Sequence, residues 1–492
     1  MVAIGLFLST LLTGVLSGLL SRHRIIDILQ TLGAFISLLL AGAIAQTVLS
    51  GQVIRALDGL IYIDALGAFN IMLIAVVGFA AAVYSVGYMR YEVDEGVISR
   101  KQLGRYYFFF HFFIFTMLVV SSVDNLGLLW VGIELTTLVS ALLVAFYGSQ
   151  HALEAAWKYL IMGVVGIAFA LLGIVFLYLS GLHTVGEQPS SALQWTQLFK
   201  VASELNPQWV EIGFIFILIG FGTKAGLAPM HFWLPDAHSQ APAPVSAVLS
   251  GVLLNTALYG LFRVFAIADI TLVGRAGEYL VGFGLFSICV TVPFIVVQHD
   301  LKRMLAFSSV EHMGIITLAI GLGGPLGFYG AFLHMLNHSL TKSLLFFSAG
   351  NIAQKYHSKF MDRISGVLQA MPFTGIVFLM SAFAIAGAPP FSIFLSEFTI
   401  MLAGVEAGKL WAAYAFAFLV VLIFAGMSYY VVRISFGAVP ARIGRKKTDV
   451  WMRIAMGIPL CFIVLFGLYL PDFIEEAINA ASSVFDGGKA WK

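Results

Sequence analysis

Charged residues are scarce in this chain. Asp, Glu, Lys and Arg make up 11% of its 492 residues, whereas a soluble domain would hold roughly 25%. The longest polar connection, at about 181–209, is too short to form a separate soluble domain. This composition excludes an ordinary soluble protein, and we expect no nucleic-acid partner.

Cysteines are also rare, and nucleotide-binding motifs are missing. The two cysteines, Cys289 and Cys461, stand far apart inside apolar runs. Their placement excludes a paired-cysteine metal site, a cysteine-ligated iron–sulfur cluster and a disulfide framework. No glycine-rich nucleotide loop is present either. We therefore expect no cofactor and no metal in this chain, so that any redox chemistry would belong to partner subunits.

Apolar residues, in contrast, are abundant. Hydrophobic residues make up 60% of the chain, and its mean hydropathy is +0.96. Runs of about 20 apolar residues, each able to cross a ~30 Å hydrocarbon core, recur from end to end. They predict an all-α polytopic membrane protein with about 14 transmembrane helices, of which the N-terminal run is the first rather than a removed signal. The predicted spans are 2–21, 25–49, 65–89, 106–123, 124–146, 157–180, 210–234, 243–268, 278–298, 304–323, 325–352, 372–403, 410–435 and 452–471.

Basic residues alternate between the loops that join these spans. Sixteen lysines and arginines fall in the odd-numbered loops and four in the even-numbered ones. The sixteen are Arg22, Arg24, Arg90, Arg100, Lys101, Arg105, Lys158, Lys302, Arg303, Lys355, Lys359, Arg363, Arg442, Arg445, Lys446 and Lys447, and the four are Arg55, Lys200, Arg275 and Lys409. The positive-inside rule then predicts a multi-pass protein of the cell (inner) membrane with both termini outside, including Lys489 and Lys492 of the tail.

Prolines and polar residues interrupt several spans. We expect breaks in span 243–268, which follows a proline-rich stretch, in span 325–352, which is polar at its middle, and in span 372–403, which contains GAPP at 387–390. Such backbone must be covered by protein or line a wet cavity. Spans 210–234 and 372–403 both carry prolines and a central charge. They lie five spans apart, an odd shift that requires inverted topology, as in transporters built from inverted repeats.

Ionisable residues occur near the middle of several spans. Each costs about 2.5–3.5 kcal/mol at the bilayer centre, which makes it a functional candidate. These residues are Glu134, Lys224, His334, His338, Lys342 and Glu397. The two histidines and Lys342 recur every four residues on one helix face. This spacing favours a proton or cation path over a stripe of interhelical hydrogen bonds, because histidine titrates near neutral pH.

Glu134 and Lys224 are candidates for a buried ion pair. Such a pair is either a static contact between helices or a switch. In the switch, moving the carboxylate away from the lysine would release the lysine proton. The free energies permit this: one pKa unit is about 1.36 kcal/mol, and one charge crossing 100 mV stores ~2.3 kcal/mol.

Other polar residues near the spans have weaker claims to a role. His231, Asp236 and His238 lie beside prolines, where Asp236 is either a turn residue or part of a proton path from the cytoplasm. His312 is a weaker relay candidate within span 304–323. We expect Arg263 to snorkel to the surface, Lys302 to be an interfacial charge, and His111 to be a hydrogen-bonded packing residue.

Three motifs carry a family resemblance. KAGLAPMHFWLPDAHSQAPAPVSA, QHDLKRMLAFSSVEHMG and HMLNHSLTKSLLFFSAG, within about 60–435, resemble the antiporter-like subunits of complex I, Mrp-type antiporters and group 4 nickel–iron hydrogenases. The resemblance implies 14 helices, with helices 7 and 12 broken. It also implies four segments: 1–105, a five-helix repeat at 106–268, its inverted counterpart at 278–435, and 436–492. It makes Glu134 and Lys224 a functional pair, His334, His338 and Lys342 the central path, and Glu397 the terminal residue near the exit.

One position departs from this family pattern. Many relatives carry lysine where LLNTALYG has Asn255, and asparagine cannot hold a proton at neutral pH. With LYGLFR after it, Asn255 resembles the hydrogenase-4 component F branch. The resemblance implies a proton-translocating protein (possibly moving Na⁺) within a hydrogenase or formate hydrogenlyase-type complex, beside other membrane subunits and peripheral nickel–iron and iron–sulfur subunits. The alternatives are a member of an Mrp-type Na⁺/H⁺ antiporter, a pumping protein of complex I, and a scaffold that no longer conducts.

Overall fold

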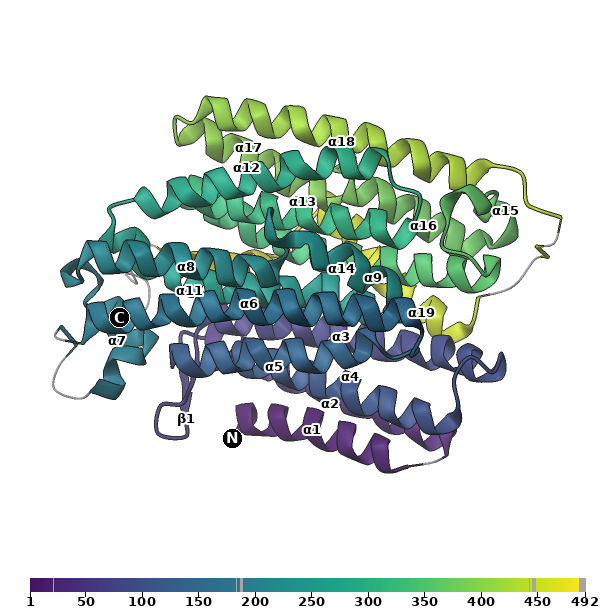
Figure 1. Ribbon diagram of the computed structural model, residues 1–492, viewed down its shortest axis with the longest axis horizontal. Helices are drawn as coiled ribbons and strands as arrows, with labels where there is room; N and C mark the ends of the chain where they lie inside the picture. Colours follow the sequence, from purple (N-terminus) through teal and green to yellow (C-terminus); the bar gives the residue numbers. More distant parts are fainter. Residues whose placement is uncertain (21, 183, 186–188, 442, 445–447, 486–492) are drawn as a thin grey trace.

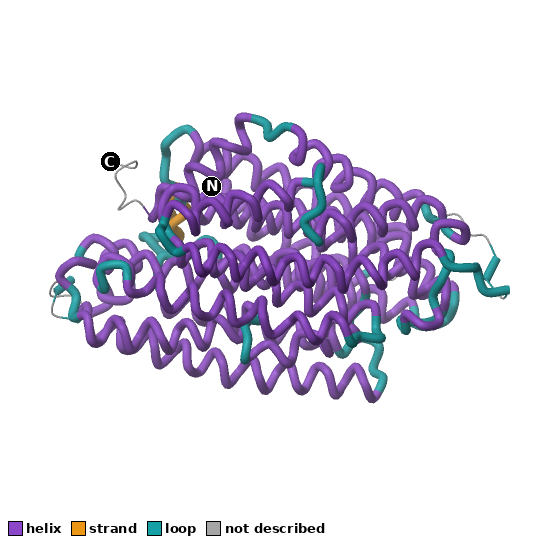
Figure 2. Tube along the Cα trace, turned by 90° about the horizontal axis from the view of Figure 1, so that it is seen from above, coloured by secondary structure: helices purple, strands orange, loops and turns teal. Residues whose placement is uncertain are grey.

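The computed structural model describes residues 1–492 except 21, 183, 186–188, 442, 445–447 and 486–492. Long helices run side by side along one direction (Figure 1), and the same arrangement is seen from above in Figure 2. Some of the basic residues that predict the orientation lie outside the described residues. These are Arg442, Arg445, Lys446, Lys447, Lys489 and Lys492.

Helices dominate the order of elements along the chain. The N-terminal part comprises α1 (Val2–Leu19), α2 (His23–Leu49), a hairpin of β1 (Ile54–Ala56) and β2 (Ile61–Ile63) in which Ile54 pairs with Ile63, and α3 (Ala65–Asp94). Next come α4 (Arg100–Val120), α5 (Leu126–Val144), α6 (Gln150–Gly181), α7 (Trp195–Lys200), α8 (Pro207–Ala225), α9 (Trp233–Gln240), α10 (Ala243–Val248) and α11 (Leu254–Thr271). The remainder comprises α12 (Arg275–Val296), α13 (Leu301–Leu322), α14 (Gly324–Tyr356), α15 (Val367–Ala370), α16 (Pro372–Ile385), α17 (Ser392–Glu406), α18 (Leu410–Phe436), α19 (Val450–Leu468) and α20 (Asp472–Ser482).

These helices coincide with the predicted spans. In the described chain, 12 helical segments are long and apolar enough to cross a membrane, with 207–240 and 243–271 each counted as one. The other two predicted spans fall on α14 and on the pair α16 and α17. The protein is therefore an all-α, multi-pass membrane protein, and the full count of 14 crossings stays a prediction.

Two of the predicted spans are interrupted. Between α8 and α9 the chain leaves the helix at Gly226, whose φ of 80° suits a glycine C-cap. Between α16 and α17 it turns at Gly387, with φ 78°. These two interruptions confirm the breaks predicted in 210–234 and 372–403.

The other two expected breaks were wrong. Helix α14 is continuous, because hydroxyls such as those of Ser339 and Thr341 donate to the carbonyl four residues earlier and leave the backbone bonds in place. The span at 243–268 is helical throughout, with α10 leading into α11 without a non-helical residue. It contains a π-helical turn at Leu249–Leu253 instead, a distortion often found at functional sites.

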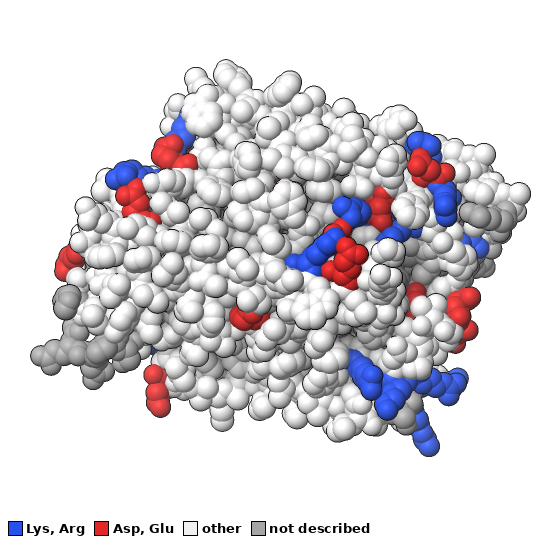
Figure 3. Space-filling view, viewed as in Figure 1, with Lys and Arg blue, Asp and Glu red and all other residues white. Residues whose placement is uncertain are grey.

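The two ends of the helix bundle differ in charge. Figure 1 places the N-terminus on the left side, with β1 and α7, and the connections α3–α4 and α5–α6 on the right. We call the right side the basic end; it holds the loops α1–α2, α3–α4, α5–α6, α12–α13, α14–α15 and α18–α19. Figure 3 shows that most of the visible face is uncharged, with several basic side chains gathered at the lower right. The N-terminus thus lies opposite the basic end.

Glycines allow close helix packing where side chains are uniformly apolar. A Cβ on Gly173 of α6 would lie 2.6 Å from the carbonyl oxygen of Gly213 on α8. A Cβ on Gly284 of α12 would lie 2.7 Å from the carbonyl oxygen of Gly314 on α13. Small residues let membrane helices approach closely where hydrophobicity alone gives no preference. These contacts fix α6 and α13, which carry or adjoin the polar residues described next.

Candidate functional site

Lys224 occupies the last turn of α8, directly before the first interruption. Its side chain is buried, and its Nζ donates to the Thr137 hydroxyl on α5 at 2.8 Å and to the Tyr159 hydroxyl on α6 at 2.5 Å. The Tyr159 hydroxyl also contacts Ser140 Oγ at 2.6 Å. The lysine is therefore held by hydroxyl groups, which accept a hydrogen bond without cancelling its charge.

Glu134 does not form the predicted ion pair. Of the ion pairs in the described chain, none joins Glu134 to Lys224, and Glu134 Oε2 has no hydrogen-bond partner there. The two groups still interact electrostatically through space. Thr137 lies one turn after Glu134 on α5 and takes the contact with the lysine. Direct pairing was wrong, but the carboxyl stands near enough to influence the ammonium.

Asn255 links the first half of the chain to α14. Its Nδ2 donates to Ser339 Oγ at 2.9 Å and to the Gly251 carbonyl at 3.0 Å. Asn255 Oδ1, although buried, has no partner among the described residues. The residue thus stands beside the π-helical turn with one free acceptor, a position that a bridging water can use.

Three histidines meet at the centre of the second half. His312 Nδ1 on α13 lies 2.8 Å from His334 Nε2 on α14, and His334 Nδ1 lies 2.9 Å from Ser396 Oγ on α17. The His338 ring is 5.3 Å from that of His312, and neither of its nitrogens has a partner in the described chain. His312, the weaker candidate from sequence, therefore contacts His334 directly and lies beside His338. A row of imidazoles can pass a proton from ring to ring.

Lys342 and Glu311 form a second lysine–carboxylate neighbourhood. Lys342 Nζ donates to the Leu305 carbonyl on α13 at 2.9 Å, and both side chains are buried. Glu311 interacts with Lys342 through space, and its Oε2 has no hydrogen-bond partner within the described residues. Sequence reasoning missed Glu311. The sequence did carry a sign of it: Glu311 is an acidic residue inside a predicted span, as Glu134 is.

Glu397 lies on α17, beyond the second interruption. Its carboxyl is buried against the backbone of Gly387, and it interacts through space with Glu311. Glu397 Oε1 lacks a partner in the part of the chain that the structure describes. The turn at Gly387 thus lies directly against the Glu397 carboxyl.

We expect Gly387→Ala to impair ion translocation by displacing Glu397. A Cβ there would collide with the Glu397 carboxyl, and the positive φ costs alanine about 1–2 kcal/mol. Gly408→Ala is the matched control, since Gly408 also has positive φ (69°) but nothing around its Cβ position. Transport by vesicles carrying each variant is the measurement. Equal transport by the two variants would show that only backbone strain matters.

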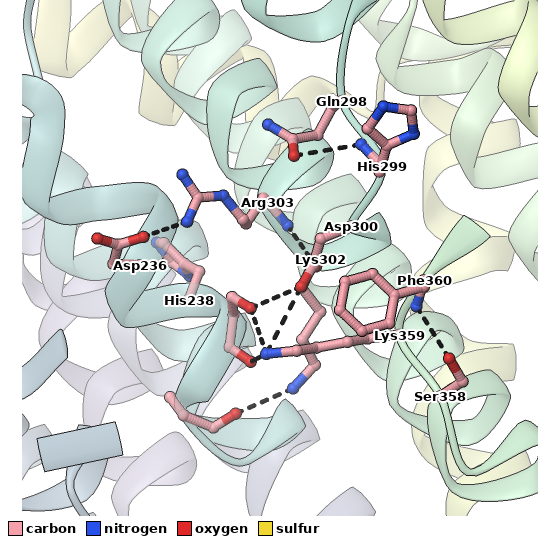
Figure 4. A network of polar contacts seen from close by, with 12 residues as sticks. Asp236, His238, Gln298, His299, Asp300, Lys302, Arg303, Ser358, Lys359 and Phe360 are labelled. Atoms are coloured by element: carbon pink, nitrogen blue, oxygen red, sulfur yellow. Dashed lines mark hydrogen bonds and ion pairs between the residues drawn. The ribbon is translucent and has the colours of Figure 1, made fainter. Parts of the chain in front are cut away.

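A separate polar network closes the basic end (Figure 4). Asp236, in the first turn of α9, forms ion pairs with Arg303 and with Lys158, the latter at 3.3 Å. It is therefore an ion-paired residue and not only a turn residue. His238 is buried against Phe346, with ring centroids 5.0 Å apart, and its ring nitrogens have no partner among the described residues.

Lys302 is not the interfacial charge that was predicted. Its side chain is buried and donates to the Ala241 carbonyl at 2.9 Å. The chain at Asp300 pairs with Phe360, and Lys359 donates to Ser239 Oγ at 2.7 Å, so these loops cover the start of α13 (Figure 4). This long-range loop contact is what removes Lys302 from water.

Two further expectations also fail. Arg263 does not reach the surface: it is 2% exposed and donates to both Asp64 carboxylate oxygens, at 2.6 and 2.5 Å. His111 packs against Phe110 as expected, but its Nε2 makes no hydrogen bond to any described residue.

The chain is similar in sequence and in fold to known membrane proteins. Residues 123–423 match a family described as NADH:quinone oxidoreductase/Mrp antiporter, TM. The chain is 38% identical over 416 residues to a hydrogenase-4 component F homolog of Methylacidiphilum infernorum, covering 84% of this chain and 86% of that one. It is 30% identical over 441 residues to the N subunit of NADH-quinone oxidoreductase from Desulforudis audaxviator, covering 85% and 84%. Its fold is similar to a chain of the Mrp complex from a Dietzia species, with a TM-score of 0.87, 20% identity and coverage of 100% and 99%.

Proposed function

The chain belongs to the NADH:quinone oxidoreductase/Mrp antiporter transmembrane family, and from this premise we propose that it translocates protons as one membrane subunit of a larger complex. The observation that carries the proposal is the buried row of ionisable side chains. The row comprises Glu134, Lys224, His312, His334, His338, Lys342, Glu311 and Glu397. Burying so many groups inside membrane helices costs free energy that packing alone does not require.

In this proposal, each lysine holds a movable proton. The Lys224 ammonium is held by the hydroxyls of Thr137 and Tyr159, while Glu134 stands nearby with one carboxyl oxygen unpartnered among the described residues. Moving the Glu134 carboxyl toward Lys224 favours the protonated lysine, and moving it away favours release of the proton. Lys342 and Glu311 repeat this arrangement. The interruptions beside Lys224 and Glu397 supply polar backbone that can hold water.

Beyond Lys224, the proposed path runs through Asn255 to the three histidines of the second half. Asn255 cannot carry a proton itself but can hold a water with its free oxygen. From there the imidazoles of His338, His312 and His334 relay the proton toward Glu397. A rigid scaffold would not need the unpartnered nitrogens of His338, because buried polar groups in structural roles are normally hydrogen-bonded.

We propose that the chain is organised in four segments, 1–105, 106–268, 278–435 and 436–492. Two features support an inverted repeat: the interruptions occupy equivalent places in the two halves, and α5 packs on α6 as α13 packs on α14. We further propose residence in the cell membrane, with the basic end in the cytoplasm and both termini outside.

For the complex itself, we propose a group 4 nickel–iron hydrogenase or formate hydrogenlyase-type assembly. The similarity to a hydrogenase-4 component F homolog and the LYGLFR stretch after Asn255 support it. Peripheral nickel–iron and iron–sulfur subunits would carry the redox chemistry, and other membrane subunits would lie beside this chain. An Mrp-type Na⁺/H⁺ antiporter or a complex I assembly is the alternative, since relatives of both kinds share the fold or the family.

Mass spectrometry of the intact complex tests this assignment. The complex is purified gently in detergent through a tag on this chain. Co-purification of nickel and iron–sulfur hydrogenase subunits is the expected result. Small hydrophobic antiporter partners without metal would overturn the hydrogenase assignment, and partners that oxidise NADH and bind quinone would replace it with complex I.

A further inference from the structure

An open cavity of about 380 Å³ lies at the basic end, between the ends of α3 and α14 and the start of α19. Its lining includes the polar residues Arg90, Asp94, Gln354, Lys355 and Asp449. Water can therefore reach into the bundle here from the side that we assign to the cytoplasm. None of the proton-path residues described so far lines this cavity.

A buried carboxyl stands directly behind the cavity wall. Glu92, in the last turns of α3, is 6% exposed, and its Oε1 accepts a 2.6 Å hydrogen bond from Gln354 Nε2. Gln354 also donates to the Tyr88 carbonyl at 3.3 Å and itself lines the cavity. The Gln354 amide thus connects water in the cavity to a carboxyl that water does not reach freely.

Behind Glu92, buried ionisable groups continue toward the centre. Glu92 interacts through space with Lys302, which donates a hydrogen bond to the Ala241 carbonyl. His238 in turn interacts with both Lys302 and Lys342, and its two ring nitrogens have no partner among described residues. Unpartnered nitrogens between two lysines leave donor and acceptor positions for bridging waters.

We propose that Glu92 is the proton-uptake site of this chain, and that Lys302 and His238 connect it to Lys342. A hydronium ion in the cavity water gives one proton to the Glu92 carboxylate and becomes water. The carboxyl passes a proton through bridging water to neutral Lys302, and the resulting ammonium passes one to His238 and on to Lys342. Only O–H and N–H bonds form and break, and one proton leaves for each that enters. This inference rests on the proposed proton translocation.

Asp236 is the competing uptake site, and its contacts disfavour it. Its carboxylate is already engaged by Arg303 and Lys158, two permanent cations near the surface. Arg303 contacts Oδ1 of Asp236 and Lys158 contacts Oδ2, so both carboxylate oxygens take part in a structural ion-pair network. Glu92, in contrast, has an uncharged amide as its hydrogen-bond partner.

Glu92→Gln in the intact complex tests the proposal. The glutamine keeps the size of the side chain but cannot carry a proton, so proton translocation into sealed vesicles should fall at least about tenfold. Glu95→Gln is the matched control, because Glu95 is exposed at the same helix end. Glu92→Asp should retain part of the activity, because it keeps a carboxyl that can carry a proton. A purely structural role would instead favour Glu92→Gln, which keeps the size of the side chain.

Lys224→Ala and Gln354→Leu separate a failure of the uptake site from a failure of the proposed function. Wild-type translocation by Glu92→Gln while Lys224→Ala still blocks transport would overturn the uptake site and leave the proposed function standing. Wild-type translocation by both variants would overturn the proposed function. If Glu92→Gln fails to assemble, Gln354→Leu is measured instead: reduced translocation with normal assembly supports the uptake site, and unchanged translocation overturns it.

Discussion

Replacing Lys224 by alanine should abolish coupled proton translocation while the protein still folds. The variant removes the ammonium that bridges α5, α6 and α8 through Thr137 and Tyr159. The Tyr159 hydroxyl keeps its contact with Ser140, so the lost contact of Thr137 is the main cost to stability, about 1–3 kcal/mol. The loss of the titratable group is the larger effect, because in the proposed function Lys224 holds the movable proton in the first half of the chain. Formation of a pH gradient by vesicles that contain the complex is the measurement.

Lys200→Ala provides the control for this variant. Lys200 ends α7 in an exposed position and lies outside the row. Gradient formation by Lys200→Ala should equal that of the wild type. If Lys224→Ala also forms a normal gradient in a correctly assembled complex, the chain is the scaffold that Asn255 first suggested.

Replacing Arg263 by methionine should cause a larger loss of stability than removing Lys224. Arg263 donates to both oxygens of Asp64, lies 4.4 Å over the Trp195 ring, and is almost fully buried. Its removal leaves the Asp64 carboxylate buried and unpaired, which costs about 3–5 kcal/mol. The midpoint of thermal unfolding in detergent and the yield of assembled complex report the loss.

A surface pair gives the comparison for Arg263. Arg275 contacts Glu211 at 2.6 Å, but its side chain is 65% exposed. Such pairs are worth about 0–1 kcal/mol, so Arg275→Met should leave the unfolding midpoint nearly unchanged. The double variant Asp64→Asn with Arg263→Met should be more stable than Arg263→Met alone, because it leaves no unpaired charge. If the double variant is no more stable than Arg263→Met, the unpaired Asp64 charge is not the cause of the lost stability.

The order of the helices could be predicted from the sequence because each span is a local signal. A run of apolar residues is long enough to cross a bilayer whatever surrounds it, and the GAPP stretch at 387–390 marks the interruption of span 372–403. The turn at Gly387 was predicted from this stretch, whereas the break at Gly226 was implied by the family resemblance. The expected break in α14 rested on its central polar residues and was wrong, because serine and threonine hydroxyls are satisfied within the helix.

Much of the candidate site could not be predicted, because its contacts join residues far apart in sequence. Arg263 meets Asp64 at a separation of 199 residues, and Lys224 meets Tyr159 at a separation of 65. Lys302 is buried where the start of α13 meets Ala241 and the loop at Phe360. No local pattern carries such pairings. Individual ionisable residues inside spans were recognisable, whereas their partners, and the importance of Glu311, depended on the packing of helices.

The ratio of protons moved to electrons transferred tests the proposed row of ionisable residues most directly. The intact complex in sealed vesicles is compared as wild type, Lys224→Ala, Lys342→Ala and the double variant. If one continuous row serves both halves, each single variant lowers the ratio and the double variant lowers it no further, since residues that act as a unit are not additive. Additive losses would show two independent paths, and an unchanged ratio in both single variants would contradict proton translocation through this row altogether.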